Sequence, residues 1–363
     1  IMEFTGCTAM KLLSQSGAPY WFRTCDIGGD IWADGAHAVS FPVGAKVYLA
    51  CREEPLTVAH ALVGVSYNAL DTWLLDGVND VGLVGGMLAL YEATSAREAA
   101  DGEDGIMGME LVTHFLATCA TVADVVRTAQ TLRVLNVNVE DEQVAAAMHF
   151  MFVEPSGRCV VLEAADKDRE GRLTVYENTL GLMTNSPPYP QQLQNLSWYL
   201  AHSPEWNWGK EKTPCLTMNG MTVSADPNAP HYSMSGTFPA SYASCDRFVR
   251  MAMLKYLNQE GKYFPDRNIL ALGSDLMCAV VEPHNQGLYH YIRFDEKEGP
   301  QGGHPSYTQY LVMYAPKKRE LYIKPYGTTA WTRICLDNCP KEKIQTHTVC
   351  HYPLGGVVEE KDL

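Results

Sequence analysis

The sequence predicts an α+β protein in which antiparallel sheets are covered by pairs of helices. Strand-like segments come in blocks rather than in strict alternation with helices, which favours antiparallel sheets over a doubly wound parallel sheet. Two pairs of helix-like segments separate these blocks. No G-x-G-x-x-G pattern follows a strand and no P-loop occurs, so a nucleotide-binding α/β fold has little support.

The first block of strands opens the chain. A hairpin is expected from residues 7–13 and 20–28, where aromatic and β-forming residues flank a turn, SQSGAP, that contains glycine and proline. Short strand-like runs follow at 46–53, 61–67 and 72–78. The opening of the chain is therefore expected to form sheet.

Two helices are expected next, at 108–119 and 121–132, because apolar residues recur there at helical spacing. Thr121 and Asp124 have the spacing of a capping pair, which predicts where the second helix begins. The later segments then alternate in blocks, as strands at 145–166 and 173–188, helices at 244–261 and 267–280, and strands at 288–295 and 307–327.

Composition and charge narrow the class of protein. The chain has 363 residues, 46% of them apolar and 19% charged, which is typical of a soluble globular protein. A formal net charge of −14 without a basic stripe argues against nucleic acid as a partner. The apolar stretch 81–91 is too short to span a bilayer and the first residues lack a signal-peptide layout. We therefore expect no membrane association and a cytoplasmic location.

Five short motifs occur in an order that resembles the choloylglycine hydrolase family, which contains bile salt hydrolases and penicillin V acylases and belongs to the N-terminal nucleophile hydrolases. They are CTAM with Cys7, WFRTCD with Arg23 and Asp26, DGVNDVGL at 76–83, GLMTNSP with Asn185, and CDRFVR with Arg247. The resemblance runs from Cys7 to about residue 337. It implies a four-layer αββα sandwich over residues 7–337, and it leaves residues 1–6 as a propeptide or a cloning remnant and 338–363 as a C-terminal extension.

The resemblance implies that Cys7 is the nucleophile. A cysteine thiol with a pKa near 8.5 needs a proton acceptor and a positive environment. In the family the acceptor is the cysteine's own α-amine, which titrates near neutrality and serves as base and then as acid. This chemistry requires Cys7 to be the first residue. Taken alone, Cys7 would more often be a small buried hydrophobe.

The other motif residues have roles implied by the same resemblance. Arg23 lies beside the sulfur and favours the thiolate, while Asp26 accepts hydrogen bonds from the α-ammonium group. Asn185 donates its side-chain amide to the oxyanion, and Arg247 supports the charge pattern of the site. Each of these residues has an ordinary alternative reading, such as a surface pair for Arg23 and Asp26 or a turn residue for Asn185.

The second oxyanion donor of the family is a backbone N–H in the segment after DGVNDVGL. Ungapped counting places it at Ala89, and a slip of one or two residues would place it at Leu90 or Tyr91. Relatives carry asparagine or tyrosine at this position, and Ala240 and Ser241 also replace a Gly-Asp pair found in bile salt enzymes. In the family, the side chains at these positions lie near the bound substrate. The resemblance therefore predicts that Leu90 and Tyr91 contact the substrate.

Cys25 and two tryptophans are further candidates. We expect Cys25 to be core filler, on the strand face opposite to Thr24 and Asp26. Trp206 and Trp208 are placed near the acyl pocket, with loop packing as the alternative. The eleven cysteines are odd in number and scattered, which favours reduced thiols over a disulfide framework.

The C-terminal stretch 335–352 gathers five residues of zinc-ligand types, namely Cys335, Cys339, His347, Cys350 and His351. Their spacing fits no standard finger. Packing against a sheet edge or a neighbouring subunit is the preferred interpretation, and we predict no metal and no cofactor.

The predicted function is hydrolysis of a linear amide C–N bond through an acyl-enzyme. Conjugated bile salts and penicillin V-like N-acyl amides are the candidate small-molecule substrates, and a homo-oligomer, a tetramer by resemblance, is expected. The alternative is an unprocessed or inactive family member that binds an acyl ligand without hydrolysis, because an acylated Cys7 nitrogen cannot accept a proton.

Overall fold

Two antiparallel sheets form the centre of the molecule. The computed structural model describes residues 4–139, 142–144, 147–177, 179–202, 215–228, 239–283, 293–295, 299–301 and 306–351. The six-stranded sheet has the spatial order β16 (Leu182–Met183), β1 (Phe4–Leu13), β2 (Pro19–Gly28), β21 (Ser306–Ala315), β22 (Glu320–Pro325) and β23 (Thr332–Cys335). The eight-stranded sheet has the order β15 (Thr174–Glu177), β14 (Cys159–Glu163), β13 (Met148–Val153), β8 (Val84–Ala89), β7 (Leu70–Asn79), β6 (Leu62–Tyr67), β3 (His37–Phe41) and β24 (Gln345–His347).

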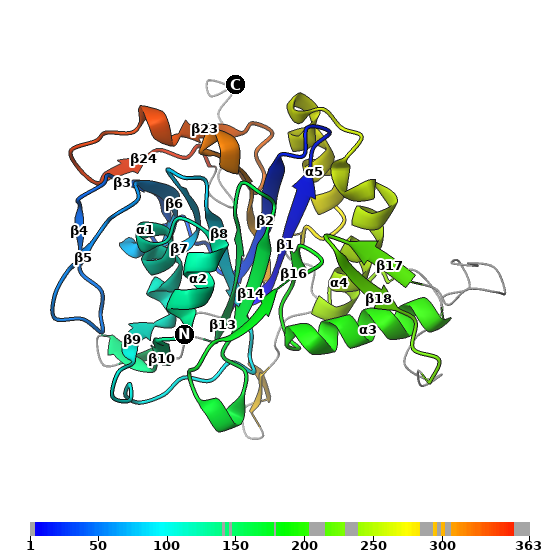
Figure 1. Ribbon diagram of the computed structural model, residues 1–363, viewed down its shortest axis with the longest axis horizontal. Helices are drawn as coiled ribbons and strands as arrows, with labels where there is room; N and C mark the ends of the chain where they lie inside the picture. The colour runs from blue at the N-terminus through cyan, green and yellow to red at the C-terminus, as the bar shows by residue number, and fades with distance from the viewer. Residues whose placement is uncertain are drawn as a thin grey trace.

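Helices cover the outer face of each sheet. The helices α1 (Leu111–Thr118) and α2 (Val122–Ala129) pack on the eight-stranded sheet, while α4 (Ser244–Leu257) and α5 (Ile269–Met277) pack on the six-stranded sheet. The two sheets contact each other through β1 and β8. Figure 1 shows this succession from α1 and α2 on the left, through the sheets, to α4 and α5 on the right. The predicted αββα sandwich is therefore confirmed.

Shorter elements connect these layers. The helix α3 (Tyr189–His202) packs against α4. The small strands are β4 (Lys46–Val47), β5 (Leu56–Thr57), β9 (Asp104–Met107), β10 (Leu132–Leu135), β11 (Val137–Val139), β12 (Glu142–Val144), β17 (Cys215–Met218), β18 (Met221–Ser224), β19 (Arg293–Asp295) and β20 (Gly299–Gln301). The 3-10 turns are η1 (Gly108–Glu110), η2 (Lys167–Arg169), η3 (Gln259–Gly261), η4 (Asp266–Asn268), η5 (Pro316–Lys318) and η6 (Leu336–Asn338).

Local sequence signals place several of these elements correctly. The expected opening hairpin is β1 paired with β2. The side chain of Thr121 accepts from the Asp124 N–H and Asp124 accepts from the Thr121 N–H, so the predicted capping box starts α2. The strand expected at 46–53 is wrong beyond its first two residues, because only Lys46 and Val47 pair and 48–53 are irregular with a turn at 50–51.

The alternation of side chains along β1 and β2 positions the site. Trp21 contacts Gly86 of the other sheet, and Phe22 contacts Gly273 of α5. Because successive side chains of a strand point to opposite faces, Arg23 and Cys25 also face the interior between the sheets. Cys7 lies opposite Cys25 in the register and shares that face. Cys25 thus lies on the opposite face from Thr24 and Asp26, as expected, but it shares its face with Arg23 and Cys7.

The C-terminal extension continues the eight-stranded sheet. Its strand β24 pairs with β3, which agrees with the expected packing at a sheet edge. The imidazole of His347 lies 2.8 Å from the Ser40 hydroxyl and 3.7 Å from the Cys339 sulfur. In the described part of the chain, no three His, Cys, Asp or Glu side chains are grouped to hold a metal ion. Nor is any helix among these residues long and apolar enough to cross a membrane.

Candidate active site

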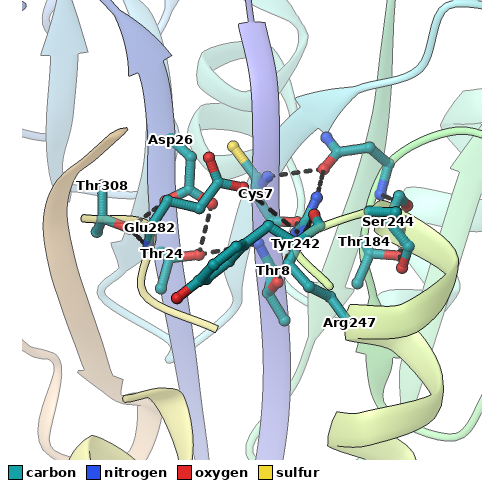
Figure 2. A network of polar contacts seen from close by, with 12 residues as sticks. Cys7, Thr8, Thr24, Asp26, Thr184, Tyr242, Ser244, Arg247, Glu282 and Thr308 are labelled. Carbon is teal, nitrogen blue, oxygen red and sulfur yellow. Dashed lines mark hydrogen bonds and ion pairs between the residues drawn. The ribbon is translucent and has the colours of Figure 1, made fainter. Parts of the chain in front are cut away.

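Cys7 lies on β1 of the six-stranded sheet and is fully buried. Its backbone N–H donates to Oδ1 of Asn185 at 2.7 Å, and its carbonyl accepts from Nη1 of Arg247 at 2.5 Å. Figure 2 shows Cys7 between the carboxyl groups of Asp26 and Glu282 on one side and Arg247 on the other. The nucleophile predicted from the sequence is thus surrounded by the partners predicted with it.

Arg23 brings a buried positive charge to the Cys7 sulfur. Its Nη2 atom lies 3.5 Å from Sγ of Cys7 and 3.5 Å from Sγ of Cys25. Its Nη1 atom forms a 2.7 Å ion pair with Asp76 and donates to the carbonyl of Leu75. Since the guanidinium fork is planar and held at both ends, Arg23 is fixed in the position where it stabilises a thiolate.

Asp76 is a site residue to which sequence reasoning assigned no role, although it begins the DGVNDVGL motif. It is fully buried on β7. Besides Arg23, it accepts hydrogen bonds from the hydroxyl groups of Tyr310 and Tyr314 at 2.6 and 2.5 Å. Its carboxylate balances the buried guanidinium, and the two tyrosines satisfy its remaining lone pairs.

The two thiols on this face are polarised in opposite directions. Burial alone would raise the pKa of Cys7, but the hydrogen bond from Cys25, the Arg23 charge and the Asp26 backbone N–H lower it to about 5. The pKa of Cys25 is raised well above its usual value by burial and by the neighbouring Cys7. Cys7 is therefore the thiolate of the pair, and Cys25 is the protonated donor.

Asp26 and Glu282 form an acidic pair on the helix-facing side of β2. Asp26 accepts from the hydroxyl groups of Thr24 at 3.1 Å and Thr308 at 2.6 Å. Burial, followed by the charges of Glu282 and Cys7, raises the pKa of Asp26 well above its usual value. Glu282 also has a raised pKa, caused first by burial and opposed by Arg247. Sequence reasoning missed Glu282, since it matches no motif.

Gly6 fits against this acidic pair because it has no side chain. A Cβ atom on Gly6 would clash with Oε1 of Glu282 and lie 3.2 Å from Nη2 of Arg247. The residue before Cys7 therefore approaches the charged groups of the site closely, within strand β1.

Asn185 is held with its amide oriented. Its Oδ1 accepts from the Cys7 N–H and from Nη2 of Arg247, both at 2.7 Å, so the atom at this position is the oxygen. Its Nδ2 then donates to the carbonyl of Ala89 at 3.0 Å. The Ser244 hydroxyl accepts from the Asn185 N–H at 2.9 Å and anchors the loop.

The backbone of Ala89 faces the same side as Asn185. The N–H and C=O of one residue in an antiparallel strand point to the same neighbour, and the Ala89 carbonyl meets Asn185. The N–H groups of Leu90 and Tyr91 are used elsewhere, by the Ala147 carbonyl at 2.8 Å and the Ser186 hydroxyl at 2.9 Å. Among the three positions considered, Ala89 therefore has the backbone donor directed toward the site.

Arg247 links the helix layer to Cys7. It is buried on α4 and donates to the Cys7 carbonyl, the Thr8 hydroxyl at 2.8 Å and Oδ1 of Asn185. Its Nε donates to the Tyr242 carbonyl at 2.8 Å and lies 3.8 Å from Glu282. This set of acceptors explains a positive residue at the start of a helix, where the dipole disfavours it.

The sequence that carries this arrangement of residues matches the profile of a known enzyme family. The family profile described as linear amide C–N hydrolases, choloylglycine hydrolase family, matches residues 7–263, beginning at Cys7. The chain belongs to this family. The match includes Cys7, Arg23, Asp26, Asn185 and Arg247, and it covers well over half of the chain.

The relatives that this chain matches differ from it in most of their sequence. An uncharacterized protein of Paramecium bursaria Chlorella virus 1 is 27% identical over 71% of this chain and 82% of its own length. The bile salt hydrolase/transferase of Clostridium perfringens is 21% identical over 69% of this chain and 71% of its own length.

Solved structures of the family share the fold. A mutant of the conjugated bile acid hydrolase from Clostridium perfringens superposes with a TM-score of 0.73 at 18% identity, over 95% of this chain and 97% of the other. Penicillin V acylase from Agrobacterium tumefaciens gives a TM-score of 0.65 at 19% identity, over 94% and 90%. At these identities the likeness establishes the fold alone.

The remaining predicted site residues differ in how exposed they are and in whether the structure describes them. Leu90 is fully buried, whereas Tyr91 is half exposed. Trp206 and Trp208 lie outside the described residues. Cys25 was expected to be core filler, but its sulfur lies beside the same guanidinium, Arg23, that contacts Cys7. Arg23 and Cys25 are two residues apart on one strand, so their side chains point to the same face, and this spacing could have revealed the contact.

Proposed function

We propose that the chain is an N-terminal-cysteine amidase that hydrolyses a linear amide C–N bond once residues 1–6 are removed. The observation that carries the proposal is the position of Cys7. Its sulfur lies 3.5 Å from the Arg23 guanidinium, and its nitrogen lies 2.7 Å from Asn185. The family profile also begins at this residue.

Removal of residues 1–6 would convert the Cys7 N–H into an α-amine. That amine would lie beside Oδ1 of Asn185, near the carboxyl groups of Asp26 and Glu282 shown in Figure 2. An amine in such a site titrates near neutral pH and can accept a proton and return it. While the Gly6–Cys7 peptide bond remains, this base is not available.

The acylation step uses the groups on both faces of β1. The Cys7 thiolate attacks the carbonyl carbon of the amide, and the carbonyl π electrons move to the oxygen. Nδ2 of Asn185 and the N–H of Ala89 donate to this oxyanion. The C–N bond then breaks, and the departing nitrogen takes a proton from the α-ammonium of Cys7. The product is a thioester on Cys7 and a free amine.

Deacylation runs through the same groups. The α-amine of Cys7 accepts a proton from water, and the resulting hydroxide adds to the thioester carbonyl. The oxyanion again forms against Asn185 and Ala89, and it collapses with release of the carboxylic acid. Cys7 leaves as the thiolate, which Arg23 stabilises.

The substrate class proposed is an N-acyl amide. Conjugated bile salts and penicillin V-like amides are the two candidates, because relatives and structural neighbours carry those names. Leu90 and Tyr91, which follow the oxyanion donor, are proposed to contact the acyl group, with Trp206 and Trp208. A homo-oligomer is also proposed, and light scattering tests it.

A substrate panel tests this proposal. Processed protein would be assayed for amine release from taurocholate, glycocholate, penicillin V and simple N-acyl amino acids, with Cys7→Ala as control. Release from at least one amide, absent in Cys7→Ala, supports the proposal. Saturable binding of these acyl compounds without any amine release would instead support the second candidate, a family member that binds an acyl ligand without hydrolysing it.

A further inference from the structure

Cys7 and Cys25 are two cysteines placed directly opposite each other on neighbouring strands. The register of β1 and β2 pairs Cys7 with Cys25, and both side chains are fully buried on the face between the sheets. Both sulfurs lie 3.5 Å from the same atom, Nη2 of Arg23. In this structure both cysteines are free thiols.

The backbone geometry of the pair suits a covalent link. The Cys7 N–H donates to Asn185 and its carbonyl accepts from Arg247, so neither group bonds to β2. Further along β1, the Lys11 N–H likewise donates away from β2, to the carbonyl of Gly181. Cys7 and Cys25 are therefore a non-hydrogen-bonded pair, for which Cα atoms are typically about 4.5 Å apart. That separation lies within the range of protein disulfides, about 4.4 to 6.8 Å.

We propose that Cys7 and Cys25 are a reversible oxidation site, in which a hydroperoxide converts the catalytic thiolate and its neighbour into a disulfide. The disulfide inactivates the enzyme and protects Cys7 from irreversible oxidation. The proposal rests on the proposed function only for access, because the path that admits an amide to Cys7 also admits the smaller peroxide.

The chemistry proceeds in two balanced steps. The Cys7 thiolate attacks the outer oxygen of the hydroperoxide, the O–O bond breaks, and Cys7 becomes a sulfenic acid while an alkoxide or hydroxide leaves. The sulfur of Cys25 then attacks the Cys7 sulfur, the S–O bond breaks, and the hydroxide takes the Cys25 proton to form water. Cys7 loses two electrons in the first step, and the two sulfurs share that oxidation in the disulfide.

Arg23 makes the order of these steps favourable. In the resting pair, the negative Cys7 and burial keep Cys25 protonated. Once Cys7 is an uncharged sulfenic acid, its negative charge no longer opposes ionisation of Cys25. The Arg23 guanidinium still lies beside the Cys25 sulfur and favours its thiolate. The same charge that stabilises the attacking thiolate then promotes deprotonation of the resolving thiol.

Mass spectrometry tests the proposal directly. Native protein would be treated with hydrogen peroxide, blocked with N-ethylmaleimide and digested without reduction. We expect a Cys7–Cys25 cross-linked peptide with a loss of about 2 Da, and its disappearance with dithiothreitol. In Cys25→Ser we expect Cys7 to gain about 32 Da as sulfinic acid, without recovery on reduction. Cys159→Ser, which removes another fully buried thiol, forms the cross-link like the unmodified chain.

Oxidation of Cys7 to sulfinic acid in the unmodified chain, with Cys25 still reduced, would overturn the proposal. So would a chain that stays unoxidised while Cys7 is alkylated by iodoacetamide, because the site is then open and reactive. These readings do not depend on amide hydrolysis. If the reduced, processed protein releases no amine and peroxide still produces the cross-link, the proposed function is refuted and this proposal stands.

Discussion

Arg23 holds its Nη2 atom 3.5 Å from the sulfur of Cys7, and both side chains are fully buried. The guanidinium keeps this position because Asp76 pairs with its other nitrogen at 2.7 Å. A buried charge fixed in this way can keep a thiol ionised well below its usual pKa. The ionisation of Cys7 on β1 thus depends on Arg23 of the neighbouring strand β2, which Asp76 of β7 on the facing sheet holds in place.

Replacing Cys7 and Cys25 one at a time distinguishes the proposed nucleophile from its neighbouring thiol. We expect Cys7→Ser to reduce amine release by at least about a thousandfold, since the hydroxyl is not ionised at neutral pH. Cys25→Ser keeps a hydroxyl donor beside Cys7, and losing part of one hydrogen bond costs at most about tenfold. Steady-state kinetics on processed protein check this, and the reverse pattern would refute the assignment of Cys7.

Replacing Arg23 changes the pH dependence of Cys7. The pKa of Cys7 is about 5, so its thiolate is present above pH 5 and is lost as the pH falls through that value. In Arg23→Met we expect the midpoint of iodoacetamide alkylation to rise from about 5 toward the ordinary thiol value of about 8.5, while the Cys25 hydrogen bond and the Asp26 N–H still lower it. Arg23→Lys keeps a charge and should move it less. Peptide mapping isolates Cys7, and a midpoint near 5 in Arg23→Met would contradict the role of Arg23.

Removing the Asn185 amide tests the oxyanion site. We expect Asn185→Ala to lower kcat by roughly 100- to 1000-fold, because losing one oxyanion donor costs about 2.7 to 4 kcal/mol of barrier. The acceptor at the Cys7 nitrogen is lost as well. Single-turnover acylation measures the chemical step apart from release. An acylation rate within a factor of about three of the unmodified enzyme would exclude Asn185 from this role.

A side chain at Gly6 should interfere with removal of residues 1–6. A Cβ atom there clashes with the Glu282 carboxylate, so we expect Gly6→Ala to push that side chain away from the Gly6–Cys7 bond and to slow cleavage. Once cleaved, Gly6→Ala protein has the same sequence as the unmodified product and should have equal activity. Intact mass over time gives the cleavage rate, with Thr5→Ala as the matched control. Equal rates for the two variants would show that the Gly6 contact is unimportant.

His114 provides a test of stability away from the site. It is 5% exposed on α1, neither ring nitrogen has a hydrogen-bond partner among the described residues, and burial lowers its pKa to about 4. The unfolded chain binds the proton at a higher pH, near 6.5, so folding stability falls as the pH drops from about 6.5 to 4. We expect this to cost up to about 3 kcal/mol, at about 1.4 kcal/mol per pH unit. Urea unfolding of His114→Gln should show a shallower loss, and equal slopes would refute the assignment.

The sequence predicted the parts of the molecule that depend on local signals. Thr121 and Asp124 mark the start of α2 because a capping box lies within one turn. The helix α3 was not predicted, since apolar residues with clear helical spacing are few between Tyr189 and His202. The family motifs supplied Cys7, Arg23, Asp26, Asn185 and Arg247, which no local pattern would have joined.

Long-range contacts explain what the sequence did not predict. Glu282 reaches Gly6 only because β1, α4 and the segment after α5 meet at one place, and no short motif records this. Asp76 was quoted within a motif, but its pairing with Arg23 depends on how the two sheets face each other. The face of Cys25 was predictable from strand alternation, and only the pairing with Cys7 required the structure.

The role of the Cys7 α-amine is tested by measuring the processed fraction and the activity in the same samples. Preparations differing in the fraction of chains that begin at Cys7 would be quantified by intact mass and assayed for amine release from the best substrate of the panel. We predict a rate proportional to that fraction, passing through zero for chains that retain residues 1–6. Equal activity in unprocessed chains, or none in fully processed chains, would contradict the central claim that the free α-amine of Cys7 is the catalytic base.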